Sequence, residues 1–215
     1  MVAQEPPADY DGTPNVHVLR AGTRLYRCHS VRRTATGFNT RRVHSHFGGG
    51  RFDATEEHPY PYYYAGTSKT TALAETLLRD VHRDQRGFHI LPRAAVQDLM
   101  LSEVETLADL RLISLLSAVD LAAVAQDRWL IHSSEYPQTR YWGHWLREQR
   151  VDAQGIIWES SRDFPHRTLI FFGDRCGDGA APLRPVGAPE PLGKPAGIDL
   201  LNTLLSPYRV IVAPD

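Results

Sequence analysis

The chain contains 215 residues, and 42% of them are hydrophobic, which is enough to bury the core of one domain and too much for a disordered protein. The 24 Lys and Arg residues nearly balance the 25 Asp and Glu residues, for a formal net charge of -1. This balance argues against direct nucleic acid binding and against attachment to an anionic membrane. Any bound anion must therefore be held by a local site.

Cysteine usage and the N-terminal sequence favour the cytoplasm. Cys28 and Cys176 lie far apart and form neither a CxxC pair nor a zinc-ligand spacing. Residues 1–11 are polar and lack the basic-then-apolar order of a signal peptide, and no apolar run reaches the roughly 18 residues of a membrane span. We therefore expect a cytoplasmic protein that neither enters nor crosses a membrane.

The first part of the chain predicts two short strands followed by a long loop. Residues 1–15 are expected to form a flexible extension, and the catalytic domain is expected to begin with strands at residues 16–19 and 24–27. Residues 34–53 are rich in Gly, Arg and His and show no apolar period, which indicates a loop. An aromatic strand is expected next, at residues 60–66.

A helix is expected to follow this strand. Ser68 can cap its N-terminus. Ala74, Leu77, Leu78 and Val81 recur at positions i, i+3, i+4 and i+7, which is the spacing of an apolar helix face.

The remaining elements predict an α+β fold with mixed or antiparallel sheets and flanking helices. Further strands are expected at residues 88–91, 100–105, 110–115, 155–158 and 168–172, and helices near 118–126 and 137–150. The last two of these strands flank a polar turn and are expected to pair antiparallel. Residues 177–197 are rich in Pro and Gly and are interpreted as a linker or wrapping arm, before a short helix at 198–205 and a strand at 209–212. We therefore divide the chain into a catalytic domain at 16–178 and an arm at 179–215.

Two arginines are candidates for binding an anion. Arg51 follows three glycines, so its guanidinium and several backbone N–H groups could converge on a pyrophosphate. On its own, such a turn is more often an ordinary tight loop. It is not a P-loop, because the Lys-Ser/Thr pair that closes one is missing. Arg27 ends a predicted strand beside Tyr26 and could reach a phosphate or pair with a surface acid.

Three further residues could line a site. Tyr64 belongs to a run of three tyrosines, which face alternate sides of a strand and could stack on a heterocycle or fill the core. Glu75 flanks the apolar helix stripe, so its carboxylate could enter a cleft or pair with Arg79 at i+4. Ser160 follows a strand, where its hydroxyl could bind a ligand or start a turn.

Two other classes of site have little support in the sequence. His44 and His46 are spaced to share one face of a strand, but no third ligand follows at a matching distance, so no metal site is expected. A serine hydrolase is disfavoured because there is no GxSxG motif to present a nucleophile.

Taken in order, several motifs of this chain resemble the RES-domain family over roughly residues 20–175. They are Tyr26-Arg27, Gly48-Gly49-Gly50-Arg51-Phe52, Tyr64-Ala65-Gly66-Thr67-Ser68, Ala72-Leu73-Ala74-Glu75, Tyr136-Pro137-Gln138-Thr139-Arg140 and Gly155-Ile156-Ile157-Trp158-Glu159-Ser160. The resemblance implies an ADP-ribosyltransferase-like fold and an enzyme that breaks the nicotinamide–ribose bond of NAD, with phosphate or water as acceptor. It also implies the toxin of a toxin–antitoxin pair, blocked by an Xre-type antitoxin.

The resemblance also implies a set of site residues. The family's functional positions fall on Arg27, Arg51, Tyr64 and Glu75, and its serine falls on Ser160. Catalytic roles are implied for Glu75, Arg51, Arg27 and Ser160, and substrate binding for Tyr26, Arg27, Arg51, Tyr64 and Ser134, which is the alternative position of the serine. NAD is expected as a substrate, with inorganic phosphate as a co-substrate, and no resident cofactor is expected.

Two rival functions stay open from the sequence. One is an ADP-ribosyltransferase that modifies a protein or a small molecule, and the other is a non-catalytic module that binds a nucleotide and leaves it intact. Homo-oligomerisation is likewise left open.

Overall fold

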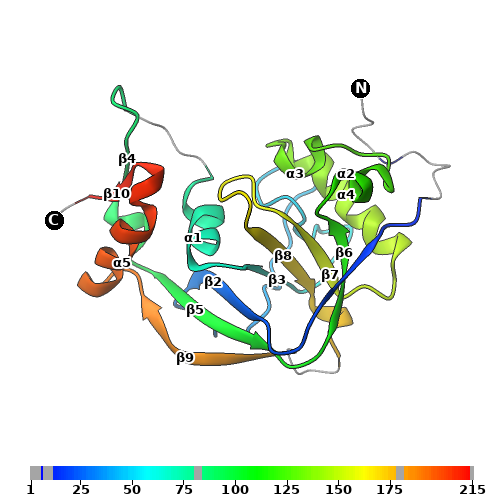
Figure 1. Cartoon of the computed structure of the whole chain (residues 1–215), viewed down its shortest axis with the longest axis horizontal. Coiled ribbons are helices and arrows are strands. Elements are labelled where there is room, and N and C mark those ends of the chain that lie inside the picture. The colour runs from blue at the N-terminus through cyan, green and yellow to red at the C-terminus, as the bar shows by residue number, and fades with distance from the viewer. Residues whose placement is uncertain (1–5, 7–11, 80–83, 178–181, 214–215) are drawn as a thin grey trace.

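The computed structural model describes residue 6 and residues 12–79, 84–177 and 182–213. Most of the predicted N-terminal extension, the predicted domain boundary at 178–179, and Val81 of the predicted helix stripe lie outside these residues. Within them the chain forms one layered α+β unit (Figure 1). The predicted α+β fold with a mixed, mainly antiparallel sheet is confirmed.

Most of the strands and helices lie close to the residue ranges that the sequence predicts. The strands are β1 (Val16–Leu19), β2 (Arg24–Ser30), β3 (Tyr62–Gly66), β4 (His89–Leu91), β5 (Leu99–Thr106), β6 (Leu110–Leu115), β7 (Gly155–Glu159), β8 (Arg167–Phe172), β9 (Leu183–Pro191) and β10 (Val210–Val212). The helices are α1 (Lys69–Leu77), α2 (Ala118–Ala122), α3 (Trp129–His132), α4 (Tyr136–Gln149) and α5 (Pro195–Leu205), with 3-10 turns η1 (Arg93–Ala95), η2 (Gly173–Arg175) and η3 (Ser206–Tyr208).

The strands form one large sheet and one small one. The large sheet has the order β1-β6-β7-β8-β3-β2-β5-β9, and its strands pair antiparallel except for β6 and β7, which are parallel. The small sheet pairs β4 with β10 in parallel. The predicted antiparallel pair at the centre is confirmed as β7 and β8.

Near its centre, between β2 and β3, the large sheet has little backbone pairing. β2 and β3 are paired at a single position, Tyr26 with Gly66, and then diverge. Gly66 is required there because an added Cβ would lie 2.8 Å from the backbone nitrogen of Ala72 in α1. The helix can therefore start directly against the strand, beside the split in the sheet.

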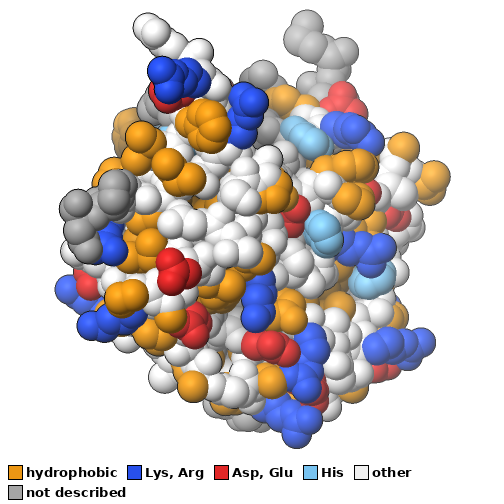
Figure 2. All heavy atoms as spheres, turned by 60° about the vertical axis from the view of Figure 1, so that its left-hand side comes forward, with side chains coloured by type: hydrophobic (Ala, Val, Ile, Leu, Met, Phe, Trp, Pro, Cys, Tyr) orange, Lys and Arg blue, Asp and Glu red, His pale blue; other side chains and the backbone are white. Residues whose placement is uncertain are grey.

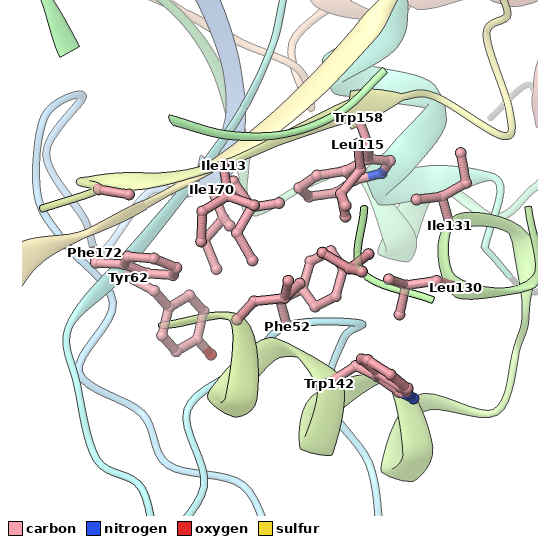
Figure 3. Packing of buried hydrophobic residues seen from close by; sticks show 14 of the residues in the cluster. Phe52, Tyr62, Ile113, Leu115, Leu130, Ile131, Trp142, Trp158, Ile170 and Phe172 are labelled. Atoms are coloured by element: carbon pink, nitrogen blue, oxygen red, sulfur yellow. The ribbon is translucent and has the colours of Figure 1, made fainter. Parts of the chain in front are cut away.

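Aromatic residues fill the core on one side of the split sheet. Phe52, Trp142 and Trp158 are all at most 3% exposed, and the rings of Phe52 and Trp158 meet edge to face with centroids 5.1 Å apart. Figure 3 shows Phe52 between the sheet residue Ile170 and Trp142 of α4. The loop that carries Arg51 is therefore anchored in the core by its next residue.

The C-terminal arm differs from its predicted form in one respect. Residues 183–191 were expected to belong to a linker or wrapping arm, with no strand predicted there, but they form β9, which pairs antiparallel with β5 at the end of the large sheet. An edge strand needs hydrogen bonds on one side, so the missing N–H groups of Pro185, Pro189 and Pro191 are tolerated there. The predicted short helix and strand that follow are confirmed as α5 and β10.

Candidate functional site

A cavity of about 480 Å³ opens where β2 and β3 diverge. It is lined by residues of β2, β3 and α1, by Arg51, by Tyr136 at the start of α4, and by Trp158 and Arg162 from the end of β7 and the loop after it. A volume of this size falls in the range of small-molecule and cofactor sites. Segments that are far apart in the sequence thus meet around one space.

The charge that lines this cavity is strongly positive. Within the described part of the chain, five arginines and one acidic residue, Glu75, line it, an excess of four positive charges. On the one face of the molecule that Figure 2 presents, basic and acidic side chains are interspersed. The cavity lining therefore carries an excess of positive charge that could attract an anion.

Glu75 is fixed in the cavity by two contacts from the loop between β7 and β8. The hydroxyl of Ser160 donates a hydrogen bond of 2.6 Å to Oε1, and Nη1 of Arg162 lies 3.3 Å from Oε2. The carboxylate side chain is 22% exposed, so one part of it stays accessible. Helix α1 presents it there because Ser68 caps the helix through the backbone N–H of Thr71, as the sequence predicts.

Ser160 is fully buried, and its hydrogen-bonding capacity is used within the protein. Its oxygen accepts the backbone N–H groups of Arg162, at 3.2 Å, and Asp163, at 3.0 Å, while its proton goes to Glu75. A hydroxyl has one donor and two lone pairs, so this set is complete. The position fits a serine that orients Glu75 and does not touch a ligand.

Arg51 lies in the cavity wall and is 7% exposed. Its Nη1 donates to the backbone oxygen of Leu130 at 2.8 Å, which fixes the guanidinium. Burial lowers the pKa of Arg51 to about 10, with Tyr136 and Glu75 opposing the shift. The group therefore stays charged near neutral pH and is poorly solvated, which strengthens its attraction for an anion.

Three guanidinium groups surround the side chain of Tyr136. The Cζ atoms of Arg51 and Arg79 lie 5.7 and 5.6 Å from the ring centroid, and Nη2 of Arg162 lies 3.5 Å from the hydroxyl. The i+4 pair of Glu75 with Arg79 that the sequence left open is not formed, since Glu75 pairs with Arg162. Tyr136 thus lies beside three like charges, and one of them, Arg162, contacts the carboxylate of Glu75.

Arg27 lines the cavity from β2 and is 5% exposed. Its Nη1 donates to the backbone oxygens of Gly37, at 2.5 Å, and Ala35, at 3.4 Å, and its Cζ lies 4.1 Å above the ring of Tyr63. Burial is the main cause that lowers the pKa of Arg27. The residue therefore both fastens the loop after β2 and borders the cavity.

The structure brings most of the predicted site residues together. Tyr26 and Tyr64 line the cavity with Arg27, Arg51 and Glu75. The hydroxyl of Tyr64 accepts the backbone N–H of Phe52 at 3.1 Å, and its ring lies edge-on to Trp158. The neighbouring rings of Tyr62 and Tyr63 are buried on opposite faces of the sheet, which gives the alternation expected for this strand.

Ser134 and the glycine turn are placed outside the cavity lining. Ser134 is exposed in the turn before α4. In the glycine turn, Gly48 and Gly49 have positive φ angles of 66° and 73°, but the N–H of Gly50 donates to the carboxylate of Asp53 at 2.8 Å. The N–H of Gly50 is therefore bonded within the protein, and the three glycines shape the loop that carries Arg51.

The described residues fit neither the pattern of a metal site nor that of a membrane span. Among the described residues there is no group of three or more His, Cys, Asp or Glu side chains arranged to hold a metal ion. The same part of the chain contains no helix that combines the length and apolar character of a membrane span.

Two important cavity residues, Arg162 and Tyr136, were not among the predicted site residues. Arg162 lies in a turn that the sequence pattern treats as a polar connection, and its contact with α1 depends on how the β7–β8 loop folds back. Tyr136 begins the Tyr136-Pro137-Gln138-Thr139-Arg140 motif of the family resemblance, and that motif is the signal that could have indicated it.

The comparisons with known proteins agree with this architecture. A family model described as RES domain matches residues 24–192. No curated protein matches the chain. The fold is similar to a chain in the crystal structure of the M. tuberculosis MbcT–MbcA toxin–antitoxin complex, with a TM-score of 0.57, 14% identity, and coverage of 93% of this chain and 92% of that chain. At this identity the likeness concerns the fold.

Proposed function

The chain belongs to the RES domain family, and on this basis we propose that its cavity binds NAD and cleaves the bond between nicotinamide and ribose. The observation that carries the proposal is the placement of Glu75. Among the residues that the structure describes, it is the one carboxylate in the cavity lining, and Ser160 and Arg162 hold it in a defined orientation.

The chemistry requires a fixed negative charge beside the ribose. When the bond from ribose to the pyridinium nitrogen breaks, its electron pair leaves with nicotinamide, and positive charge develops on the ribose. A carboxylate held in advance stabilises this charge without having to reorganise during the reaction. We assign this role to Glu75, and we assign to Ser160 the role of orienting it.

Arginine and tyrosine side chains would hold the rest of the substrate. Arg27 and Arg51 are both buried and charged in the cavity wall, which suits charge-assisted hydrogen bonds to a pyrophosphate. The rings of Tyr26 and Tyr64 offer flat apolar surface for the nicotinamide or the ribose. These contacts would position the substrate and take no part in bond making.

The surplus of positive charge favours phosphate over water as the acceptor. The two negative charges of the NAD pyrophosphate are partly offset by the pyridinium, so NAD alone leaves most of the excess of four positive charges in the cavity unmatched. Arg51, Arg79 and Arg162 meet around Tyr136 next to Glu75, where an attacking anion would have to bind. In this reaction a phosphate oxygen would form the new bond to the ribose carbon as nicotinamide leaves.

A partner protein is part of the proposal. The similar fold occurs in a toxin–antitoxin complex, and an enzyme that consumes NAD would harm the cell that makes it. We therefore propose that the chain is the toxin of such a pair and that an antitoxin, expected to be of the Xre type, covers the cavity.

Incubation of the protein with NAD, followed by proton NMR, tests the proposed reaction. Release of free nicotinamide by the wild type, and its loss in Glu75→Gln, would support it. Intact NAD would contradict it. Radiolabelled ADP-ribose on a macromolecule would show a transferase instead.

A further inference from the structure

The loop between β7 and β8 forms hydrogen bonds to helix α1 near both ends of the helix and at Glu75. Asp163 accepts hydrogen bonds at the start of the helix, from Ser68 at 3.2 Å and from Thr71 at 2.6 Å. At the other end, Nε of Arg162 donates to the backbone oxygen of Leu78 at 3.3 Å. Between these two points lies the contact of Ser160 with Glu75, so the loop and the helix form one unit around the carboxylate.

Asp163 is the most constrained member of this loop. It is 5% exposed, and a buried carboxylate is stable only when its oxygens receive hydrogen bonds. One oxygen, Oδ2, accepts from Ser68 and Thr71. The other, Oδ1, accepts from the hydroxyl of Tyr208 and lies 3.3 Å from Nδ1 of His166.

The position of Asp163 determines where the hydroxyl of Ser160 points. The backbone N–H of Asp163 donates to Oγ of Ser160, and the N–H of Arg162 fills the second lone pair. With both lone pairs occupied, the single proton of Ser160 is directed to Glu75. A shift of Asp163 would therefore change the hydrogen bond that orients the carboxylate.

Tyr208 approaches this unit from the C-terminal arm. It ends η3, directly after α5, and residues of α5 pack with Ala72 and Leu73 of α1 in one hydrophobic cluster. Burial and the contact with Asp163 raise the pKa of Tyr208 to about 12, so its hydroxyl keeps its proton and can donate near neutral pH. The arm thus contacts the loop through the hydrogen bond from Tyr208 to Asp163.

We propose that Tyr208 is a positioning residue for Glu75 and acts through Asp163 and Ser160. By this arrangement the C-terminal arm sets the geometry of the carboxylate, although Tyr208 does not line the cavity. The kinetic consequence rests on the proposed function, but the hydrogen-bonded chain can be tested without any reaction.

The first experiment compares Tyr208→Phe with the matched variant Ser206→Ala in the full chain. Both changes remove one hydroxyl from η3, but the hydroxyl of Ser206 is exposed and bonds locally to the backbone oxygen of Thr203. We expect Tyr208→Phe to lower kcat for nicotinamide release about tenfold with KM nearly unchanged, since one hydrogen bond to a charged group is lost. Ser206→Ala should leave both constants unchanged. Equal kinetics of the two variants would overturn the proposal.

A double-mutant cycle separates positioning from general destabilisation. If Tyr208 acts through Ser160, the effect of Tyr208→Phe should largely vanish in a Ser160→Ala background. Additive losses would show that Tyr208 does not act through Ser160.

Amide hydrogen exchange supplies a readout that does not need NAD. Because the N–H groups of Arg162 and Asp163 bond to Ser160, Tyr208→Phe should speed their exchange about tenfold relative to Ser206→Ala. Unchanged exchange overturns the proposal even if the wild type proves inactive on NAD. Inactivity with accelerated exchange would contradict the proposed function and leave the positioning chain supported.

Discussion

Replacing Glu75 by Gln removes the charge of the side chain while keeping its size and an oxygen that can accept from Ser160. At a separation of ~4 Å and an effective dielectric of ~20, a carboxylate attracts a developing unit charge by ~4 kcal/mol, or about three powers of ten in rate. Arg162, 3.3 Å from the other oxygen, offsets part of this charge. We therefore expect kcat to fall by about 10²- to 10³-fold.

The assay follows nicotinamide release over time at saturating NAD, with circular dichroism and thermal unfolding to establish that the variant is folded. Glu103→Gln is the matched control, because Glu103 lies on β5, pairs with Arg24 at 3.0 Å and does not line the cavity. It should keep wild-type kcat. A folded Glu75→Gln variant whose kcat stays within about tenfold of the wild type would refute the electrostatic role of the carboxylate.

Two further predictions concern an anion-binding side chain and a buried histidine. Arg51→Lys should raise KM for NAD or phosphate about tenfold, because an ammonium cannot bond to Leu130 and also present a planar fork to an anion; unchanged values in steady-state kinetics would remove Arg51 from anion binding. Burial lowers the pKa of His144 from 6.5 to about 3, so between these values the unfolded chain takes up a proton that the folded chain does not. The contribution of neutral His144 to the free energy of unfolding is therefore fully present above pH 6.5. As the pH falls below this value, the free energy of unfolding decreases by up to ~1.4 kcal/mol per pH unit. Urea unfolding at about pH 6 and pH 4 should show a weaker pH dependence for His144→Gln, and an equal dependence would contradict the assignment.

Local sequence signals were sufficient where neighbouring residues determine the structure. The cap at Ser68 fixes the start of α1 and with it the direction of Glu75, and the alternation of the tyrosines on β3 turns Tyr64 toward the cavity. These features depend on the period of a helix or a strand, which a single sequence displays.

The remaining features depend on contacts between distant segments. Arg162 reaches α1 across more than 80 positions, and Tyr208 reaches Asp163 across 45. The sequence does not predict β9, because its prolines normally argue against a strand. Proline is acceptable here only because the strand lies at the edge of the sheet. The saturated hydroxyl of Ser160 likewise becomes visible only when the backbone of its own loop is placed.

The most direct test of the account is to incubate the purified protein with NAD, with and without inorganic phosphate, and to identify the products by mass spectrometry. We predict free nicotinamide together with a phosphorylated ADP-ribose, at a rate that rises with phosphate and saturates. Formation of unphosphorylated ADP-ribose at a rate independent of phosphate would contradict the role given to the three arginines around Tyr136. NAD that stays intact under both conditions would contradict the central claim that this cavity cleaves it.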